Sequence, residues 1–180
     1  MNKLKTALAF SKNLLTTGAL FQTSSKVEDA ISSKISNDPN MVYVEFGMGH
    51  GNITQVILDK MSPSSKLYSF EINEEFCDTV RKSIKDERLT IVNKGAEDLN
   101  SLVERHVDCI VSSIPFTLFT KEKTDSILKL SYDKLKSNCF FSQVQYSKVL
   151  KKKFISSFDS FELNHVSKLP PEFIYHCLKK

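Results

Sequence analysis

Three glycines at alternate positions, Gly47, Gly49 and Gly51, are the first feature of the sequence whose residue type and spacing could do chemistry. They follow the apolar run of residues 41–46 and precede a run with helical periodicity. Glycine permits a tight turn between a strand and a helix, and it lets a ligand approach the backbone closely. The spacing is GxGxG and not the GxGxxG of dinucleotide-binding enzymes. A plain turn between a strand and a helix would also account for it.

A carboxylate lies at the end of the next expected strand. Glu71 follows Gly47 at roughly the 20-residue interval at which an acidic side chain reaches the ribose of a ligand bound at such a turn. A carboxylate can accept hydrogen bonds from both ribose hydroxyls. The alternative is a solvated carboxylate at a strand end, like Glu74 and Glu75 nearby. Together, the turn and the carboxylate predict a ligand of the nucleoside type.

A segment with two serines and a proline, residues 111–116 (VSSIPF), follows the fourth expected strand. In an open parallel sheet, ligands bind outside the carboxyl ends of the strands. Ser112, Ser113 and Pro115 are therefore expected to face the group that reacts with the bound ligand. The alternative is an ordinary exit from a strand, ended by the proline.

The elements that must position these residues alternate between strands and helices. The expected strands are residues 41–46, 66–72, 89–92, 107–111, 139–146, 161–166 and 173–178, and the expected helices are residues 53–61, 74–84 and 122–135. A proline-containing connection joins the last two strands into an antiparallel hairpin. This order predicts an α/β fold: a Rossmann-like, seven-stranded, mostly parallel sheet with helices on both faces and a C-terminal antiparallel hairpin.

The length of 180 residues predicts a single domain over residues 1–180, with N-terminal helices in residues 1–36 and the Rossmann-like core in residues 41–180. The composition, 41% hydrophobic and 26% charged, is typical of a soluble globular protein. The cysteines lack metal-ligand spacing and the histidines are scattered, so we expect reduced thiols, a cytoplasmic protein and no metal site. No stretch has the ~20 apolar residues of a membrane-spanning helix.

Residues 2–16 have the pattern of an amphipathic helix. The apolar face would carry Leu4, Ala7, Leu8, Leu14 and Leu15, flanked by Lys3, Lys5 and Lys12. Such a helix can lie peripherally on an anionic membrane surface, here the inner membrane, or it can pack on its own domain. A second group of lysines, at positions 148 and 151–153, could serve the same surface or belong to a solvated helix face.

The glycine turn and its neighbouring acids resemble the motifs of class I S-adenosylmethionine-dependent methyltransferases. In this resemblance residues 47–51 are motif I, and Glu45 is the acid that orients the methionine portion of the cofactor. Glu71 is the ribose-binding acid, and residues 95–97 (GAE) take the place of the adenine-edge motif, although Gly95 stands where Asp is usual. The resemblance implies S-adenosylmethionine as cofactor and S-adenosylhomocysteine as product. The cofactor-binding residues that it implies are Glu45, Gly47, Met48, Gly49, Gly51, Glu71, Ile72, Ala96, Glu97 and Ser112.

The segment after the fourth strand resembles motif IV of amino-methyltransferases, (Asn/Asp)-x-Pro-(Tyr/Phe), with a serine in the first place. Over most of the chain, the sequence is similar to bacterial phospholipid N-methyltransferases, which methylate phosphatidylethanolamine. The similar segments are residues 17–25 (TGALFQTSS), residues 112–115 (SSIP), Tyr146 near the end of the fifth strand, and residues 169–171 (LPP). This resemblance implies methyl transfer to a phospholipid amine. The catalytic residues that it implies are Ser112, Ser113, Pro115 and Tyr146.

Tyr146 has a physical reason to lie at such a site. An ethanolamine headgroup becomes a fixed cation as it gains methyl groups, and aromatic faces attract such cations by about 0.5–2 kcal/mol. Phe116 and Phe119 could contribute further faces, or all three rings could belong to the core.

Other functions also fit the sequence. Ribosomal RNA adenine dimethyltransferases share the general layout, but they usually carry an extra C-terminal helical domain for which this chain has no room. RNA is therefore a less favoured acceptor, and a small-molecule amine is a further one. A function of another class is a non-catalytic S-adenosylmethionine-binding module. The acceptor, the number of methyl groups transferred and the oligomeric state are open at the level of sequence.

Overall fold

A computed structural model of the chain describes residues 24–168 and 171–180. Within these residues, seven strands form one sheet in the order β3-β2-β1-β4-β5-β7-β6. The strands are β1 (Val42–Phe46), β2 (Lys66–Phe70), β3 (Leu89–Val92), β4 (Val107–Ser112), β5 (Leu135–Gln145), β6 (Ser160–Lys168) and β7 (Pro171–Lys179). The first five strands are parallel, and β7 is antiparallel to both β5 and β6. This arrangement confirms the predicted α/β fold and its antiparallel hairpin.

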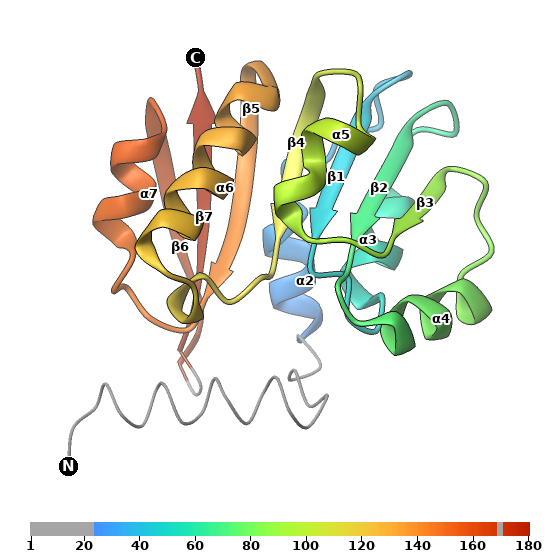
Figure 1. Cartoon of the computed structure of the whole chain (residues 1–180), viewed down its shortest axis with the longest axis horizontal. Helices are drawn as coiled ribbons and strands as arrows, with labels where there is room; N and C mark the ends of the chain where they lie inside the picture. The colour runs from blue at the N-terminus through green and yellow to red at the C-terminus, as the bar shows by residue number, and fades with distance from the viewer. Residues whose placement is uncertain (1–23, 169–170) are drawn as a thin grey trace.

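Helices cover both faces of the sheet (Figure 1). The helices of the described residues are α2 (Ser25–Ile31), α3 (Asn52–Lys60), α4 (Glu74–Ser83), α5 (Leu99–Leu102), α6 (Lys121–Lys134) and α7 (Lys151–Ser157). α6 and α7 pack on one face, and α2 and α3 pack on the other. Since α7 includes residues 151–153, these lysines belong to a helix. The helix predicted in residues 2–16 lies outside the described residues, and a single domain over residues 1–180 stays a prediction.

An aromatic cluster forms the core between the sheet and helices α6 and α7. The rings of Phe141 and Phe158 stack with 5.4 Å between their centroids, and those of Phe154 and Tyr175 lie 5.0 Å apart. All four side chains are buried. Burying one such side chain contributes about 1.5–3 kcal/mol, so this cluster stabilises the position of β5 and β7 in the sheet. The chain has no tryptophan, and phenylalanine and tyrosine supply the large rings of this core.

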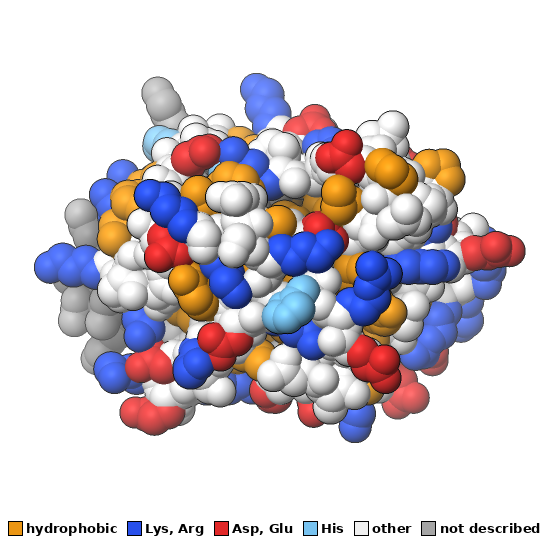
Figure 2. Space-filling model, turned by 90° about the horizontal axis from the view of Figure 1, so that it is seen from above, with side chains coloured by type: hydrophobic (Ala, Val, Ile, Leu, Met, Phe, Trp, Pro, Cys, Tyr) orange, Lys and Arg blue, Asp and Glu red, His pale blue; other side chains and the backbone are white. Residues whose placement is uncertain are grey.

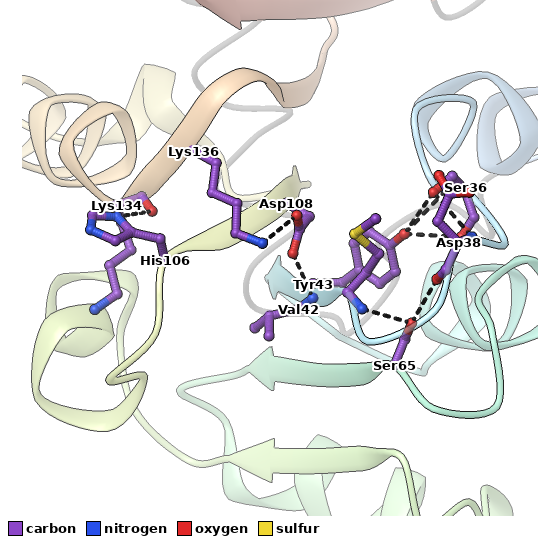
Figure 3. A network of polar contacts seen from close by, with 10 residues as sticks. Ser36, Asp38, Val42, Tyr43, Ser65, His106, Asp108, Lys134 and Lys136 are labelled. Carbon is purple, nitrogen blue, oxygen red and sulfur yellow. Dashed lines mark hydrogen bonds and ion pairs between the residues drawn. The ribbon is translucent and has the colours of Figure 1, made fainter.

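Polar contacts hold the amino end of β1 against β4 and β5 (Figure 3). The carboxylate of Asp108 accepts hydrogen bonds from Val42 N at 2.8 Å and from Lys136 Nζ at 2.7 Å. The Tyr43 hydroxyl donates to the Ser36 carbonyl oxygen at 2.9 Å. These contacts fix the position of the amino end of β1 in the sheet. The glycine turn follows the other end of β1, so its position depends on them as well.

Helix α4 packs beside that turn. Its N-cap, Asn73, accepts a hydrogen bond from Glu75 N at 2.9 Å, an interaction that typically stabilises a helix by about 1 kcal/mol. Cys77 and Val80, one turn apart on the buried face of α4, pack against Met48 of the glycine turn. The N-cap fixes where α4 begins, and its buried face positions the helix beside the glycine turn.

Two strand ends differ from the prediction in ways that matter for the site. The strand expected over residues 66–72 ends at Phe70, so Glu71 and Ile72 lie beyond it. The strand expected over residues 139–146 begins at Leu135 and ends at Gln145. Residues 136–138 of its first part are polar, but the buried Leu135 pairs with Val107 of β4 and joins this part to the sheet.

Candidate active site

The glycine turn has a left-handed backbone at all three glycines. Gly47, Gly49 and Gly51 have φ angles of 82°, 53° and 87°. Both Gly47 N and Met48 N donate to the Phe70 carbonyl oxygen, at 2.9 and 3.2 Å. The turn is therefore anchored to the end of β2 by its own backbone, in a conformation that side-chain-bearing residues rarely adopt.

Close packing as well as backbone conformation favours glycine at two of these positions. A Cβ atom on Gly47 would lie 2.9 Å from Ser113 Oγ, and one on Gly51 would lie 3.0 Å from a methyl group of Val80. The first contact shows that the segment after β4 touches the glycine turn. The second shows that α4 does as well.

Glu71 lies directly against the turn, as its position in the sequence predicted. Its side chain is buried, and Glu71 Oε2 accepts a hydrogen bond from Gly49 N at 3.0 Å. Glu71 Oε1 accepts one from Asn73 N at 2.9 Å. Each oxygen can accept further hydrogen bonds, because a carboxylate offers about four acceptor positions. Asn93, which follows β3, donates from its side-chain amide to the Glu71 carbonyl oxygen at 2.9 Å. The sequence analysis missed Asn93, although its place at a strand end was a signal.

Glu45 is fully buried beneath the turn. Glu45 Oε2 accepts hydrogen bonds from Thr54 Oγ1 and Ser69 Oγ, both at 2.7 Å. Glu45 Oε1 has no hydrogen-bond partner among the described residues. Burial raises the pKa of Glu45 to about 7, against the two hydroxyl hydrogen bonds and with a smaller contribution from the charge of Glu71. The site thus contains a buried carboxyl group with one free acceptor.

The segment after β4 is tied to the glycine turn. Ser113 N donates to the Phe46 carbonyl oxygen at 2.9 Å, and Ser113 Oγ donates to the Gly47 carbonyl oxygen at 2.7 Å. Ser112 is fully buried, and its hydroxyl has no partner among the described residues. The two regions that the sequence analysis singled out therefore form one constellation, at the carboxyl edge of the sheet.

Gln143 of β5 supports this segment and was missed by the sequence analysis. Its side-chain amide donates to the Ile114 carbonyl oxygen at 3.1 Å, while its own Oε1 has no partner among the described residues. The register of β4 and β5, with Ser112 opposite Gln143, explains the contact. The amide holds the loop before Pro115 in place.

The predicted adenine-edge residues follow β3. Ala96 is buried at the start of a short 3-10 helix. Ile72, which follows Glu71, is 75% exposed. Glu97 forms an ion pair with Lys123 of α6, with 2.9 Å between Oε1 and Nζ. Partial burial would raise the pKa of Glu97, but the Lys123 ammonium outweighs it and holds that pKa below its ordinary value.

Phe116 and Tyr146, two aromatic residues that the sequence placed near the predicted acceptor site, have different surroundings. Phe116 is 1% exposed and packs against Phe141 and Phe154, so it belongs to the core. Tyr146 lies one residue beyond β5 and is partly buried. Burial raises the pKa of Tyr146 to about 12, and the nearby carboxylate of Glu172 adds to the shift. The structure thus separates Tyr146 from the core ring of Phe116.

The opposite edge of the sheet contains a cavity but none of these residues. The cavity has a volume of about 320 Å³ and is lined by Val42, Tyr68, Leu102, Val103, Glu104 and Arg105. Basic and acidic side chains are interspersed on this edge (Figure 2). Among residues 24–168 and 171–180, no three potential ligand side chains are grouped to hold a metal ion. No helix in the same part of the chain is long and apolar enough to cross a membrane.

A mostly parallel sheet with a glycine turn after its first strand and a buried acid after its second fits a ligand of the nucleoside type at the carboxyl edge of the sheet. Residues 44–138 match the methyltransferase domain family, and the chain belongs to that family. The protein is therefore a transferase that uses S-adenosylmethionine and releases S-adenosylhomocysteine.

Curated and solved relatives agree with this class. The chain is 26% identical over 144 residues to an ornithine lipid N-methyltransferase of Singulisphaera acidiphila, covering 76% of this chain and 74% of the relative. Its fold is similar to that of precorrin-6y C5,15-methyltransferase of Geobacter metallireducens, with a TM-score of 0.74, 16% identity, and 90% and 92% of the two chains covered. It is also similar to a Streptococcus mutans protein solved with S-adenosylhomocysteine, with a TM-score of 0.63, 17% identity, and 84% and 95% coverage.

Proposed function

We propose that the cofactor lies along the glycine turn, with its ribose at Glu71. Three observations support this placement. The oxygens of Glu71 keep acceptor positions free while two backbone groups orient them. Ile72 leaves a large apolar side chain exposed beside that acid, where a purine ring could cover it. Glu45 keeps one buried oxygen free, which fits the ammonium group of the methionine portion. The proposed cofactor-binding residues are Glu45, Gly47, Met48, Gly49, Gly51, Glu71, Ile72, Ala96, Glu97 and Ser112.

The chemistry in this site needs positioning more than acid or base groups. S-adenosylmethionine supplies a methyl group on a sulfonium cation, which is already activated for transfer. The chain's own residues must hold the cofactor and an acceptor in line and keep water away. The hydrogen bond from Ser113 to Gly47 keeps the glycine turn at a constant distance from residues 112–116, which we propose as the acceptor segment.

We propose that the acceptor is the amine of a membrane lipid headgroup such as phosphatidylethanolamine. The observation that carries this proposal is the relative, an ornithine lipid N-methyltransferase, whose similarity covers three quarters of each chain. Ser112, Ser113, Pro115 and Tyr146 would shape the acceptor site. Bound S-adenosylmethionine would supply the methyl group, and an amine held at this site would have to release one proton to solvent before its nitrogen could accept that group.

A lipid acceptor also requires access to a membrane surface. We propose that the protein works in the cytoplasm and binds the inner membrane peripherally. The amphipathic pattern of residues 2–16 supports this proposal, and so do the exposed Lys148 and Lys152 on the loop and helix after β5. Exposed basic side chains favour an anionic lipid surface.

A methyl-transfer assay with separate acceptors tests the proposed function. The full chain is incubated with radiolabelled S-adenosylmethionine and vesicles that contain either phosphatidylethanolamine or only phosphatidylglycerol, which has no amine. We expect label in the lipid fraction only with phosphatidylethanolamine. A parallel incubation with ribosomal RNA should give no label, and label there would replace the lipid with RNA. Binding of S-adenosylhomocysteine without transfer to any amine would favour a non-catalytic module.

A further inference from the structure

The C-terminal hairpin places a third acid, Glu172, at the carboxyl edge of the sheet. Strand β7 runs antiparallel to β5, and Gln145 at the end of β5 pairs with Phe173 near the start of β7. The next residues along each strand, Tyr146 and Glu172, are therefore neighbours. Figure 1 shows the end of β5 and the start of β7 together at the lower edge of the sheet, on the side where β1, β2 and β4 also end.

Glu172 is a buried acid without a partner. It is 5% exposed, and burial raises its pKa. No hydrogen bond or ion pair joins its carboxylate to another residue in the described part of the chain. The ammonium of Lys148 lies instead 4.8 Å from the ring centroid of Phe173. Successive residues of a strand point to opposite faces, so Phe173 and Glu172 face different sides of the sheet.

The burial pattern agrees with this alternation. Phe173 belongs to the aromatic core beneath α6 and α7, whereas Val144 and Ile174 belong to the cluster that packs against α2. Glu172 is two residues from Ile174 in β7, so it shares the α2 side of the sheet. Tyr146 directly follows β5, and the charge of Glu172 contributes to its raised pKa, which agrees with their being neighbours. A ring and a carboxylate thus lie together at the edge that also carries the acceptor segment.

Burial removes most of the water that would otherwise solvate this carboxylate, and no cationic side chain of the described residues pairs with it, so its charge is only partly compensated. A bound cation would supply the missing partner. The phenol ring of Tyr146 beside it would suit a cation whose surface is covered with methyl groups, since aromatic faces attract such cations. An anionic or neutral ligand would leave the carboxylate uncompensated.

We propose that Glu172 and Tyr146 form a subsite for the alkylammonium group of the methyl acceptor. Glu172 binds the positive charge, and the Tyr146 ring packs against the methyl or methylene groups around it. This inference rests on the proposed function, because it assigns a position to the amine of that function's substrate. The subsite would bind the ammonium form of the acceptor before transfer and each methylated product after it, since all of these are cations. The bound ammonium would release one proton to solvent before its nitrogen accepts a methyl group.

The test uses choline as the probe, because its trimethylammonium group is cationic at every pH. The full-length protein saturated with S-adenosylhomocysteine is titrated with choline, and binding is followed by saturation-transfer NMR. The comparison ligand, 3,3-dimethylbutan-1-ol, has the same shape without the charge. We expect choline to bind about tenfold or more tightly than this alcohol, the factor that one charge-assisted contact contributes.

Variants locate the site. Glu172→Gln keeps the shape of the side chain and should weaken choline binding about tenfold or more. Tyr146→Leu should weaken it about threefold, whereas Tyr146→Phe, which keeps the ring, should not. The matched control is Glu162→Gln, because Glu162 is an exposed acid of the same hairpin that pairs with Lys34. In the lipid assay, Glu172→Gln should raise the KM for phosphatidylethanolamine by a similar factor with the affinity for S-adenosylhomocysteine unchanged.

The outcomes separate this inference from the proposed function. If the wild type methylates lipid amine but Glu172→Gln leaves both choline affinity and KM unchanged, the subsite is refuted and the function stands. If choline and its uncharged analogue bind equally, the subsite is likewise refuted. If S-adenosylhomocysteine binds but lipid amine is not methylated, the proposed acceptor fails, while charge-selective choline binding through Glu172 would still support an alkylammonium ligand.

Discussion

Three carboxyl groups at one edge of the sheet have different surroundings, and these surroundings give each group a different role. Glu71 is buried but receives two backbone hydrogen bonds. Glu45 has two hydroxyl donors on one oxygen and none on the other. Glu172 is buried with no partner in the described part of the chain. The number of donors that reach each group, more than its residue type, determines which ligand charge it can accept.

Replacing Glu71 should weaken cofactor binding. Glu71→Ala removes the proposed ribose acceptor, and a hydrogen bond to a charged group is worth about 1.5–3 kcal/mol, so the Kd for S-adenosylmethionine should rise about tenfold to a hundredfold. Calorimetry measures this change. Glu74→Ala, three positions along in α4, is the control and should bind normally. Equal affinity of Glu71→Ala and wild type, with unchanged melting temperatures, would remove Glu71 from this role.

Glu45 should make the ligand-free protein less stable as the pH rises. Burial raises its pKa from 4.5 to about 7, so between these values the native state holds a proton that the unfolded chain releases. The free energy of unfolding therefore falls as the pH rises through this window and stays lower above it, by on the order of 3 kcal/mol at most. Urea titrations at about pH 5 and about pH 8 measure the loss. Glu45→Gln should lose much less, and an equal loss in both proteins would assign the effect to other groups.

At the scale of elements, the junction between β1 and α3 combines a backbone requirement with a packing requirement. Gly51 precedes α3 with φ of 87°, and a methyl group there would lie 3.0 Å from a methyl group of Val80 in α4, which is a tight contact. Gly95 is a useful contrast, because its φ is −78° and only the flexible carboxylate of Glu97 lies near the position of a Cβ atom. The two glycines share a residue type but serve different structural needs.

Substitution by alanine should separate these needs. Gly51→Ala should lower the free energy of unfolding by about 1–3 kcal/mol, because the left-handed backbone becomes strained. Gly95→Ala should change it by less than about 0.5 kcal/mol. Chemical denaturation measures both values. If the two variants were equally stable, the left-handed conformation at Gly51 would not be required.

At the scale of the whole molecule, the site lies at one edge of the sheet and the cavity at the other. The hydrogen bonds and turns described above gather where β1, β2 and β4 end, and the hairpin adds β7 to the same edge. The proposed lipid amine would have to reach this edge from a membrane surface. The basic groups predicted to mediate this contact are in residues 2–16 and in the region of Lys148.

The N-terminal segment should carry the protein to anionic vesicles. Each basic residue near an anionic surface adds about 1 kcal/mol, so binding should be stronger to vesicles with anionic lipid and should weaken with salt. Leu8→Glu places a charge in the predicted apolar face and should abolish binding in a sedimentation assay. Asn13→Glu adds the same charge on the opposite side of the predicted helix and should bind better than Leu8→Glu. If Leu8→Glu bound vesicles normally but had a lower melting temperature, the segment would be structural, and the lysines near position 148 would have to mediate binding.

The sequence by itself determined the order of strands and helices, the parallel sheet with its terminal hairpin, and the glycine turn with Glu71. These features depend on periodicity and on residue types within short segments, and such signals are local. Strand ends were less well determined. The start of β5 shows why, since residues 136–138 are polar and the place of this part in the sheet depends on the burial of Leu135 and on its pairing with Val107.

Only the tertiary structure decided which distant residues meet. Ser113 donates to Gly47 from 66 positions away, Gln143 supports Ile114 from a neighbouring strand, and Tyr146 lies beside Glu172 because of the register between β5 and β7. The same holds for Phe116, whose ring joins the core and not the acceptor site. The physical reason is that such contacts depend on the register and packing of whole elements, which the spacing of residues along a single segment does not encode.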